Sequence, residues 1–129
     1  MPLLRFDLIE GRSESEVKSL LDAAHQAMLA AFNVPPRDRY QIVQEHPRSH
    51  MIIEDTGLGM ERSEKLVVVQ VITRGRKKKQ KEALYRLLCE ALQRACGIPP
   101  TDVIVTMVEN RDEDWSFGLG HAQFLTGEL

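Results

Sequence analysis

An internal repeat at a constant offset of 64 positions is the feature that most constrains the fold of this 129-residue chain. The two halves align without a gap. Gly11-Arg12 falls on Gly75-Arg76, and residues 32–38 (FNVPPRD) fall on residues 96–102 (CGIPPTD). A chain that repeats one unit in this way is expected to build its fold from one supersecondary motif used twice.

Each half is predicted to form a strand, a helix and a second strand. Residues 3–9 alternate between apolar and polar side chains, as a half-buried strand does. Ser13 and Glu16 form a capping-box pattern that predicts a helix start, and Asn33 before the Pro35-Pro36 pair predicts its end. The remaining predicted elements are a strand at 40–44, a strand at 66–72, a helical apolar stripe at 84–95 and a strand at 103–108.

Each predicted helix connects two strands as a crossover, so the strands within one half should be parallel. The fold class expected is α/β (α+β): a tandem β-α-β repeat giving a four-stranded mixed sheet with two helices on one face. Residues 1–129 should form a single domain, with halves at about 2–64 and 65–129. No third helix is predicted for the other sheet face, although residues 66–72 are almost continuously apolar, which is typical of a strand covered on both faces. A bare apolar sheet face predicts an obligate oligomer.

Composition excludes several classes of protein. A hydrophobic content of 43% and a net charge of −2 exclude a disordered chain and argue against a protein dedicated to binding phosphates of nucleic acids. Aromatic residues make up only 5%, so a stacking platform for single-stranded nucleic acid is not expected. No apolar run is long enough to span a membrane, and no signal peptide is recognisable. The prediction is a cytoplasmic protein that binds neither nucleic acid nor membrane.

The charges are unevenly distributed between the halves. Residues 1–64 carry 7 basic and 11 acidic side chains, whereas residues 65–129 carry 10 and 8, with six basic groups concentrated in residues 74–81. This run precedes the second helix, where the first half has acidic residues that suit the helix dipole. Basic groups beside free helix N–H groups predict an anion site, and the two forks of Arg74 and Arg76 suit a carboxylate. The alternative, a solvated basic turn, applies mainly to the lysines.

The second difference between the halves lies at Pro2. Methionine before a small residue is normally removed, which would expose Pro2 as a secondary amine. An α-amino group has a pKa of about 7.7–8.0 and can act as an acid or a base near neutral pH, or add to a carbonyl to form an iminium. Asp38 follows Pro35-Pro36, but Asp102 repeats the same pattern, so the pattern by itself indicates turn chemistry.

Several segments together resemble one known family. They are residues 2–12 (PLLRFDLIEGR), 34–43 (VPPRDRYQIV), His46-Pro47, 55–59 (DTGLG) and 114–118 (DWSFG). In this order, and over essentially the whole chain, they resemble the malonate semialdehyde decarboxylase family of the tautomerase superfamily. The resemblance implies a homotrimer. It also implies decarboxylation of malonate semialdehyde (3-oxopropanoate) to acetaldehyde and CO2 without a metal or an organic cofactor.

The resemblance also implies roles for individual residues. The catalytic residues would be Pro2 and Asp38, the carboxylate would be bound by Arg74 and Arg76, and an apolar wall would be formed by Trp115, Phe117 and Phe124. Protonated Pro2 would donate to the aldehyde oxygen while Asp38 keeps the amine cationic. A Schiff-base route through neutral Pro2 is equally consistent with these residues, and Asp38 activating water would give a hydratase side activity.

Two other interpretations of the sequence remain. The first is another enzyme of the same superfamily, such as a 3-chloroacrylic acid dehalogenase or hydratase, or a keto–enol tautomerase. The second belongs to a different class, a module that binds an anionic partner through residues 74–81, whose binding would depend steeply on salt. It leaves Pro2 and Asp38 without a role.

Overall fold

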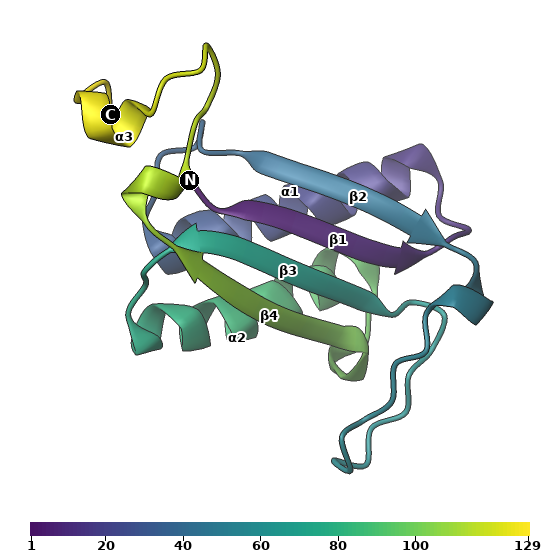
Figure 1. Cartoon of the computed structure of the whole chain (residues 1–129). Helices are drawn as coiled ribbons and strands as arrows, with labels where there is room; N and C mark the ends of the chain where they lie inside the picture. The colour runs from purple at the N-terminus through teal and green to yellow at the C-terminus, as the bar shows by residue number, and fades with distance from the viewer.

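The computed structural model describes residues 1–129 as one sheet with helices packed on one side (Figure 1). The strands are β1 (Leu3–Ile9), β2 (Tyr40–His46), β3 (Val67–Arg74) and β4 (Val103–Asn110). The helices are α1 (Glu14–Phe32), α2 (Lys78–Cys96) and the short α3 (Gln123–Thr126). The 3-10 turns are η1 (Arg48–His50), η2 (Pro100–Asp102) and η3 (Asp112–Asp114).

The sheet has the strand order β2-β1-β3-β4. Strands β1 and β2 are parallel, β3 and β4 are parallel, and β1 runs antiparallel to β3. The prediction of a four-stranded mixed sheet with two main helices is therefore confirmed. Because of this order, the starts of β1 and β2 lie at the same end of the sheet as the ends of β3 and β4 (Figure 1). We call this the amino-terminal end of the sheet.

The predicted helix boundaries follow from local capping. The Ser13 hydroxyl accepts from the Glu16 N–H, and the Glu16 carboxylate accepts from the Ser13 N–H, which starts α1 as a capping box. Asn33 ends α1 in the left-handed conformation, with φ of 52°. Helix α2 has no acidic residue in its first turn, and its Lys77 N–H is capped by the Gln80 side chain instead.

Strands β2 and β4 are each two residues longer than predicted. The predicted ends at 44 and 108 rest on side-chain character, whereas the ladders continue through polar residues to His46 and Asn110. Backbone pairing does not require an apolar side chain, because its hydrogen bonds join main-chain groups. The longer β4 carries the chain to the amino-terminal end of the sheet.

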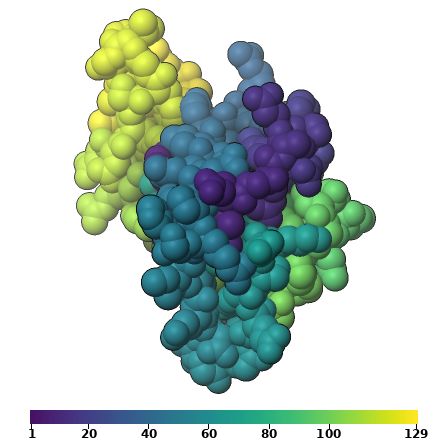
Figure 2. All heavy atoms as spheres, turned by 90° about the vertical axis from the view of Figure 1, so that its right-hand side faces the viewer, coloured from purple at the N-terminus to yellow at the C-terminus, as the bar shows by residue number.

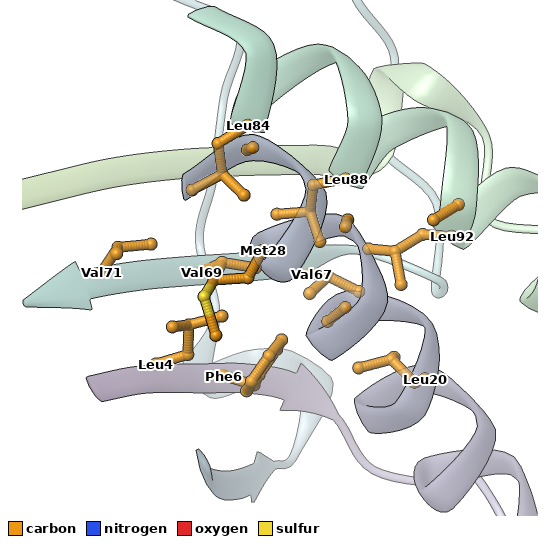
Figure 3. Packing of buried hydrophobic residues seen from close by; sticks show 14 of the residues in the cluster. Leu4, Phe6, Leu20, Met28, Val67, Val69, Val71, Leu84, Leu88 and Leu92 are labelled. Atoms are coloured by element: carbon orange, nitrogen blue, oxygen red, sulfur yellow. The ribbon is translucent and has the colours of Figure 1, made fainter. Parts of the chain in front are cut away.

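The hydrophobic core lies between the sheet and the two long helices (Figure 3). Alternate residues of β1 and β3 point into it, and the helices cover them with aliphatic side chains; the labelled examples are Leu4, Phe6, Val67, Val69, Val71, Leu20, Met28, Leu84, Leu88 and Leu92. The other side chains of β3 are only partly buried within the chain. On the sheet face that points away from the helices, Ile42 of β2 and Val108 of β4 are more than two-fifths exposed. The chain thus leaves one face of its sheet without a cover of its own.

Residues 51–66 project from the body of the molecule at the end of the sheet opposite the amino-terminal end (Figures 1 and 2). The Asp55 carboxylate accepts hydrogen bonds from the N–H groups of Gly57, Gly59 and Met60, which lower the pKa of Asp55. Ile52 is 83% exposed at the surface of this extension. The extension is ordered by its own hydrogen bonds while it presents apolar surface outward. No helix in the chain is both long and apolar enough to cross a membrane.

The repeated Pro-Pro-x-Asp segments make the same turn with different side-chain partners. The N–H of Asp38 donates to Pro35 O at 3.0 Å, and the N–H of Asp102 donates to Pro99 O at 2.9 Å. The Asp102 side chain is fully buried and accepts hydrogen bonds from the N–H of Ser63, at 2.7 Å, and from the Ser63 hydroxyl. In the second half, the aspartate therefore fastens the loop before β3 to the start of β4.

Replacing Asp102 by Ala should destabilise the fold. The substitution removes the hydrogen bonds that the Ser63 N–H and hydroxyl donate to the buried Asp102 carboxylate, which costs about 1–3 kcal/mol in free energy of unfolding. Urea unfolding followed by circular dichroism measures this loss. Asp38→Ala is the matched control at the equivalent position, where the structure predicts a smaller loss because Asp38 holds no buried backbone group through its side chain. Equal losses at the two positions would contradict this interpretation.

Candidate active site

The amino-terminal end of the sheet brings together the α-amino group, Asp38, Arg74 and Arg76. The Met1 α-ammonium lies 3.0 Å from Asp38 Oδ2. Asp38 is held there by the turn between α1 and β2, and the two arginines follow from the end of β3. Pro2 is buried directly before β1. Pro2 and Asp38 are 36 positions apart in sequence. They lie in one site because the starts of β1 and β2 pair with each other.

The environment of the α-amino group controls its charge. Its pKa is lowered from the ordinary value of 8.0, mainly because burial disfavours the charged form. Asp38 opposes this change through its hydrogen bond and its negative charge, whereas the positive charges of Arg76 and Arg74 add to it. The four groups are therefore electrostatically coupled. An amine in this setting changes its protonation closer to neutral pH than a free amine does.

Arg76 lies between the sheet and helix α1. Its Nε donates to Thr73 Oγ1 at 3.1 Å, and its guanidinium lies 4.7 Å above the ring of Phe32. Burial and the nearby Arg74 charge lower the pKa of Arg76, while Asp38 opposes the change. The Arg76 Nη2 group is buried and has no hydrogen-bond partner within the chain. A buried, unpaired donor of this kind suits an anionic ligand.

Arg74 is held from the side of the C-terminal segment, residues 111–129, which follows β4. Its Nη1 donates to Asp112 Oδ1 at 2.9 Å, and its guanidinium lies 4.1 Å from the ring centroid of Phe124. Its Nε is buried without a partner within the chain. Arg74 and Arg76 therefore each present an unpaired buried donor beside the amine, as the predicted carboxylate site requires.

The aromatic residues predicted from the family resemblance lie together. Trp115 and Phe117 are stacked with centroids 5.3 Å apart, and Phe124 meets Phe117 edge-on at the same distance. The indole N–H of Trp115 donates to Asn110 Oδ1 at 2.7 Å, which anchors this segment to the end of β4. Figure 1 shows the C-terminal segment and α3 at the same end of the sheet as the N-terminus. The aromatic cluster therefore borders the arginine pair through Phe124.

The structure adds residues that the sequence did not indicate. Tyr40 at the start of β2 packs on Phe117 with centroids 5.7 Å apart, and Thr73, Phe32 and Asp112 contact the two arginines. These residues meet only through the pairing of strands and the packing of the folded chain. Tyr40, for example, pairs with Leu3 at the start of β1. Phe32 lies in the repeated segment 32–38 and Tyr40 in the segment 34–43, but neither pattern assigns either residue to the site. The basic run is not uniform either, since Lys81 is paired with Glu109.

A large surface hollow lies elsewhere. It has a volume of about 520 Å³ and is lined by Ile9, Met51, Met60 and Leu66 among others, beside the 51–66 extension. Two of its charged side chains already have partners, because Asp55 accepts three backbone N–H groups and Arg62 donates to the carbonyl of Glu54. No group of three or more His, Cys, Asp or Glu side chains lies close enough together to hold a metal ion. The unpaired donors therefore point to the amino-terminal end of the sheet as the site.

Comparison with known proteins shows which family the chain belongs to. Two family models, both described as tautomerase enzymes, match residues 38–118 and residues 2–61. The chain is 61% identical to the probable tautomerase YrdN of Bacillus subtilis (strain 168) over the whole length of both. Its structure is similar to a malonate semialdehyde decarboxylase solved in wild-type, mutant and inactivated forms, with a TM-score of 0.97, 57% identity and 98% coverage of each chain.

Two further solved structures extend the comparison. A malonate semialdehyde decarboxylase inhibited by 3-bromopropiolate is 40% identical, with a TM-score of 0.94 over 98% of this chain and 97% of that one. A fused 4-OT protein in an asymmetric trimer is 26% identical, with a TM-score of 0.76 over 96% of this chain and 98% of that one. The family models and the relatives lead to one conclusion: the chain is a member of the tautomerase family of enzymes.

Proposed function

We propose that this enzyme is a cofactor-independent decarboxylase that converts malonate semialdehyde to acetaldehyde and CO2. The observation that carries the proposal is the pair of unpaired buried donors, Arg74 Nε and Arg76 Nη2, beside an α-amino group held by Asp38. Such a site can bind a carboxylate and place an acid next to it. The 57% identity to a malonate semialdehyde decarboxylase supports this choice of substrate.

Pro2 is the proposed acid. In the chain that retains Met1, the Met1 amine occupies the position beside Asp38. Removal of Met1 makes the Pro2 nitrogen the terminal amine, one residue further along and already buried in the site. Asp38 then stabilises the protonated form, and the arginines oppose it, as they do for the amine of Met1. Burial, Asp38 and the two arginines together set the fraction of Pro2 that is protonated at neutral pH.

The reaction breaks one carbon–carbon bond. Arg74 and Arg76 hold the carboxylate with that bond out of the plane of the aldehyde carbonyl, which aligns the breaking bond with the carbonyl π system. The electron pair released with CO2 moves toward the aldehyde oxygen, where protonated Pro2 donates its proton to form the enol. The enol then takes up a proton from water at carbon and returns its hydroxyl proton to the Pro2 amine, which gives acetaldehyde and restores protonated Pro2. In the iminium variant, neutral Pro2 first condenses with the aldehyde and releases water, and the same electron pair then moves to the iminium nitrogen. The resulting enamine is protonated at carbon, and hydrolysis releases acetaldehyde and free Pro2.

We also propose that the enzyme works as a homotrimer. One face of its sheet has no cover within the chain, and residues 51–66 present apolar side chains outward. An uncovered apolar face of this kind favours association. The fused 4-OT structure, which is described as a trimer and shares 26% identity, supports a trimer over other oligomers.

A second candidate activity uses the same groups. The relative YrdN is called a probable tautomerase, and the decarboxylase at 57% identity is described with both decarboxylase and hydratase activities. A keto–enol tautomerase also needs an acid–base amine beside a carboxylate clamp. Assays with an enol of an α-keto acid and with an acetylenic acid, run beside 3-oxopropanoate, separate these activities by their relative kcat/KM.

The role of the terminal amine can be tested by changing the N-terminus of the chain. Intact-mass measurement should show a protein lighter by one methionine residue. This protein should release acetaldehyde from 3-oxopropanoate, whereas a chain with an uncleaved N-terminal extension should lose at least about a hundredfold in kcat/KM, because its terminal amine is no longer in the site. The same extension at the C-terminus is the control. Equal activity of the two extended chains would contradict a role for Pro2. Borohydride trapping of a substrate adduct would favour the iminium variant.

Substitutions at Arg76 and Lys78 test whether Arg76 has a role that the other basic residues of 74–81 do not share. Arg76→Ala removes a charge-assisted hydrogen bond to the carboxylate and should lower kcat/KM for 3-oxopropanoate by about tenfold to a hundredfold. Lys78→Ala removes one positive charge from the same run and should change kcat/KM by less than about twofold, because exposed charges couple weakly. Equal losses in both variants would instead favour a general attraction of anions by residues 74–81.

Asp38 and Arg76 act on the pKa of the terminal amine in opposite directions, so substitutions at the two positions should have opposite effects. Asp38 favours the protonated amine, so Asp38→Asn should lower the pKa of Pro2 and move the high-pH limb of kcat/KM to lower pH. Arg76→Gln should move the amine pKa upward, because Arg76 disfavours the protonated form. Titration of the Pro2 nitrogen by NMR in the substrate-free protein measures both. If the pKa of the Pro2 amine shifts in the same direction in both variants, this electrostatic arrangement is excluded.

A further inference from the structure

We infer that Asp112 is a positioning residue that orients Arg74 so that its free edge faces the substrate carboxylate. The inference rests on the proposed carboxylate site and adds a residue to it. Asp112 lies in η3, 38 positions after Arg74, and the two side chains meet because β3 and β4 end side by side, with Arg74 opposite Asn110. Asp112 belongs to the C-terminal segment, which follows the last strand of the sheet.

The atoms that pair decide between a positioning role and a blocking role. A guanidinium offers two edges for a bidentate carboxylate, one formed by Nε and Nη2 and the other by Nη1 and Nη2. Asp112 Oδ1 contacts Arg74 at Nη1, at 2.9 Å. The edge that contains Nε is left unused, and Nε is buried without a partner within the chain. Asp112 therefore holds one end of the guanidinium and leaves a complete edge for a ligand.

A second contact fixes the plane of the same group. The Arg74 guanidinium lies 4.1 Å from the centroid of Phe124, so one of its faces is covered by an aromatic ring. The hydrogen bond to Asp112 and the contact with the Phe124 ring together restrict the rotation of the guanidinium. Both partners come from the C-terminal segment, so this segment sets the direction in which Arg74 donates.

The turn that carries Asp112 is itself held in place. The Asp114 carboxylate accepts from the N–H of Arg111 at 2.7 Å, and the Trp115 indole donates to Asn110 at 2.7 Å, on either side of η3. The Asp112 side chain is half-exposed, so its ion pair with Arg74 adds little to the stability of the fold. Its effect should therefore appear in ligand binding, while the melting temperature stays nearly constant.

Malonate binding measured by calorimetry tests the inference without relying on turnover. Asp112→Ala removes the acceptor for Arg74 and should raise the Kd for malonate by about threefold to fivefold, the coupling expected of a partly exposed ion pair. KM for 3-oxopropanoate should rise by a similar factor, with a smaller change in kcat. Asp112→Asn keeps a carbonyl oxygen for Arg74 and should restore most of the affinity. Glu113→Ala, which removes a neighbouring negative charge, should bind malonate as the wild type does.

The outcomes separate this inference from the proposed function. If Asp112→Ala binds malonate as tightly as the wild type or more tightly, or if the wild type does not bind malonate, the positioning role is overturned. Tighter binding would show that Asp112 competes with the ligand for Arg74. If 3-oxopropanoate is not decarboxylated but Asp112→Ala weakens malonate binding and Asp112→Asn restores it, the proposed reaction fails and the positioning role stands.

Discussion

The antiparallel pairing of β1 with β3 is the constraint on which the rest of the structure depends. Within each half, a helix crossover fixes two parallel strands, but this leaves the halves without a fixed relation. The β1–β3 ladder, with Leu3 opposite Ile72, brings the start of the first half against the end of the third strand. The terminal amine and Arg74 come together for this reason. A slip of this register by one residue would also turn the apolar side chains of one of the two strands away from the helices.

The duplicated unit provides an internal comparison of structural and functional residues. Both Pro-Pro-x-Asp turns close with the same backbone hydrogen bond, yet Asp102 is buried against Ser63 while Asp38 reaches the terminal amine. Helix α1 begins with acidic residues that suit its dipole, whereas α2 begins after two arginines and has no acidic residue in its first turn. The first copy places a carboxylate at the amino-terminal end of the sheet, and the second copy places cations there. The proposed site combines the two.

The repeat and the local signals predicted much of the fold. The alternation of residues 3–9 and the Ser13–Glu16 pair act over a few residues, so the sequence shows them directly and the structure agrees. The C-terminal segment could not be predicted in this way. The contact of Tyr40 with Phe117 and that of Arg74 with Asp112 join distant positions through strand order and tertiary packing, which no local periodicity encodes. The sequence therefore indicated Arg74 and Arg76 as a carboxylate site without showing which atoms are free to bind.

The central claim is that an amine and two arginines at one end of the sheet decarboxylate a small β-keto acid. The most direct test is the steady-state release of acetaldehyde from 3-oxopropanoate by the Met1-processed protein, coupled to a reductase and compared with the spontaneous rate. The account predicts saturable turnover with kcat/KM of about 10⁴ M⁻¹s⁻¹ or more, within the usual range of enzymes on their own substrates. Release of acetaldehyde at only the spontaneous rate would contradict it.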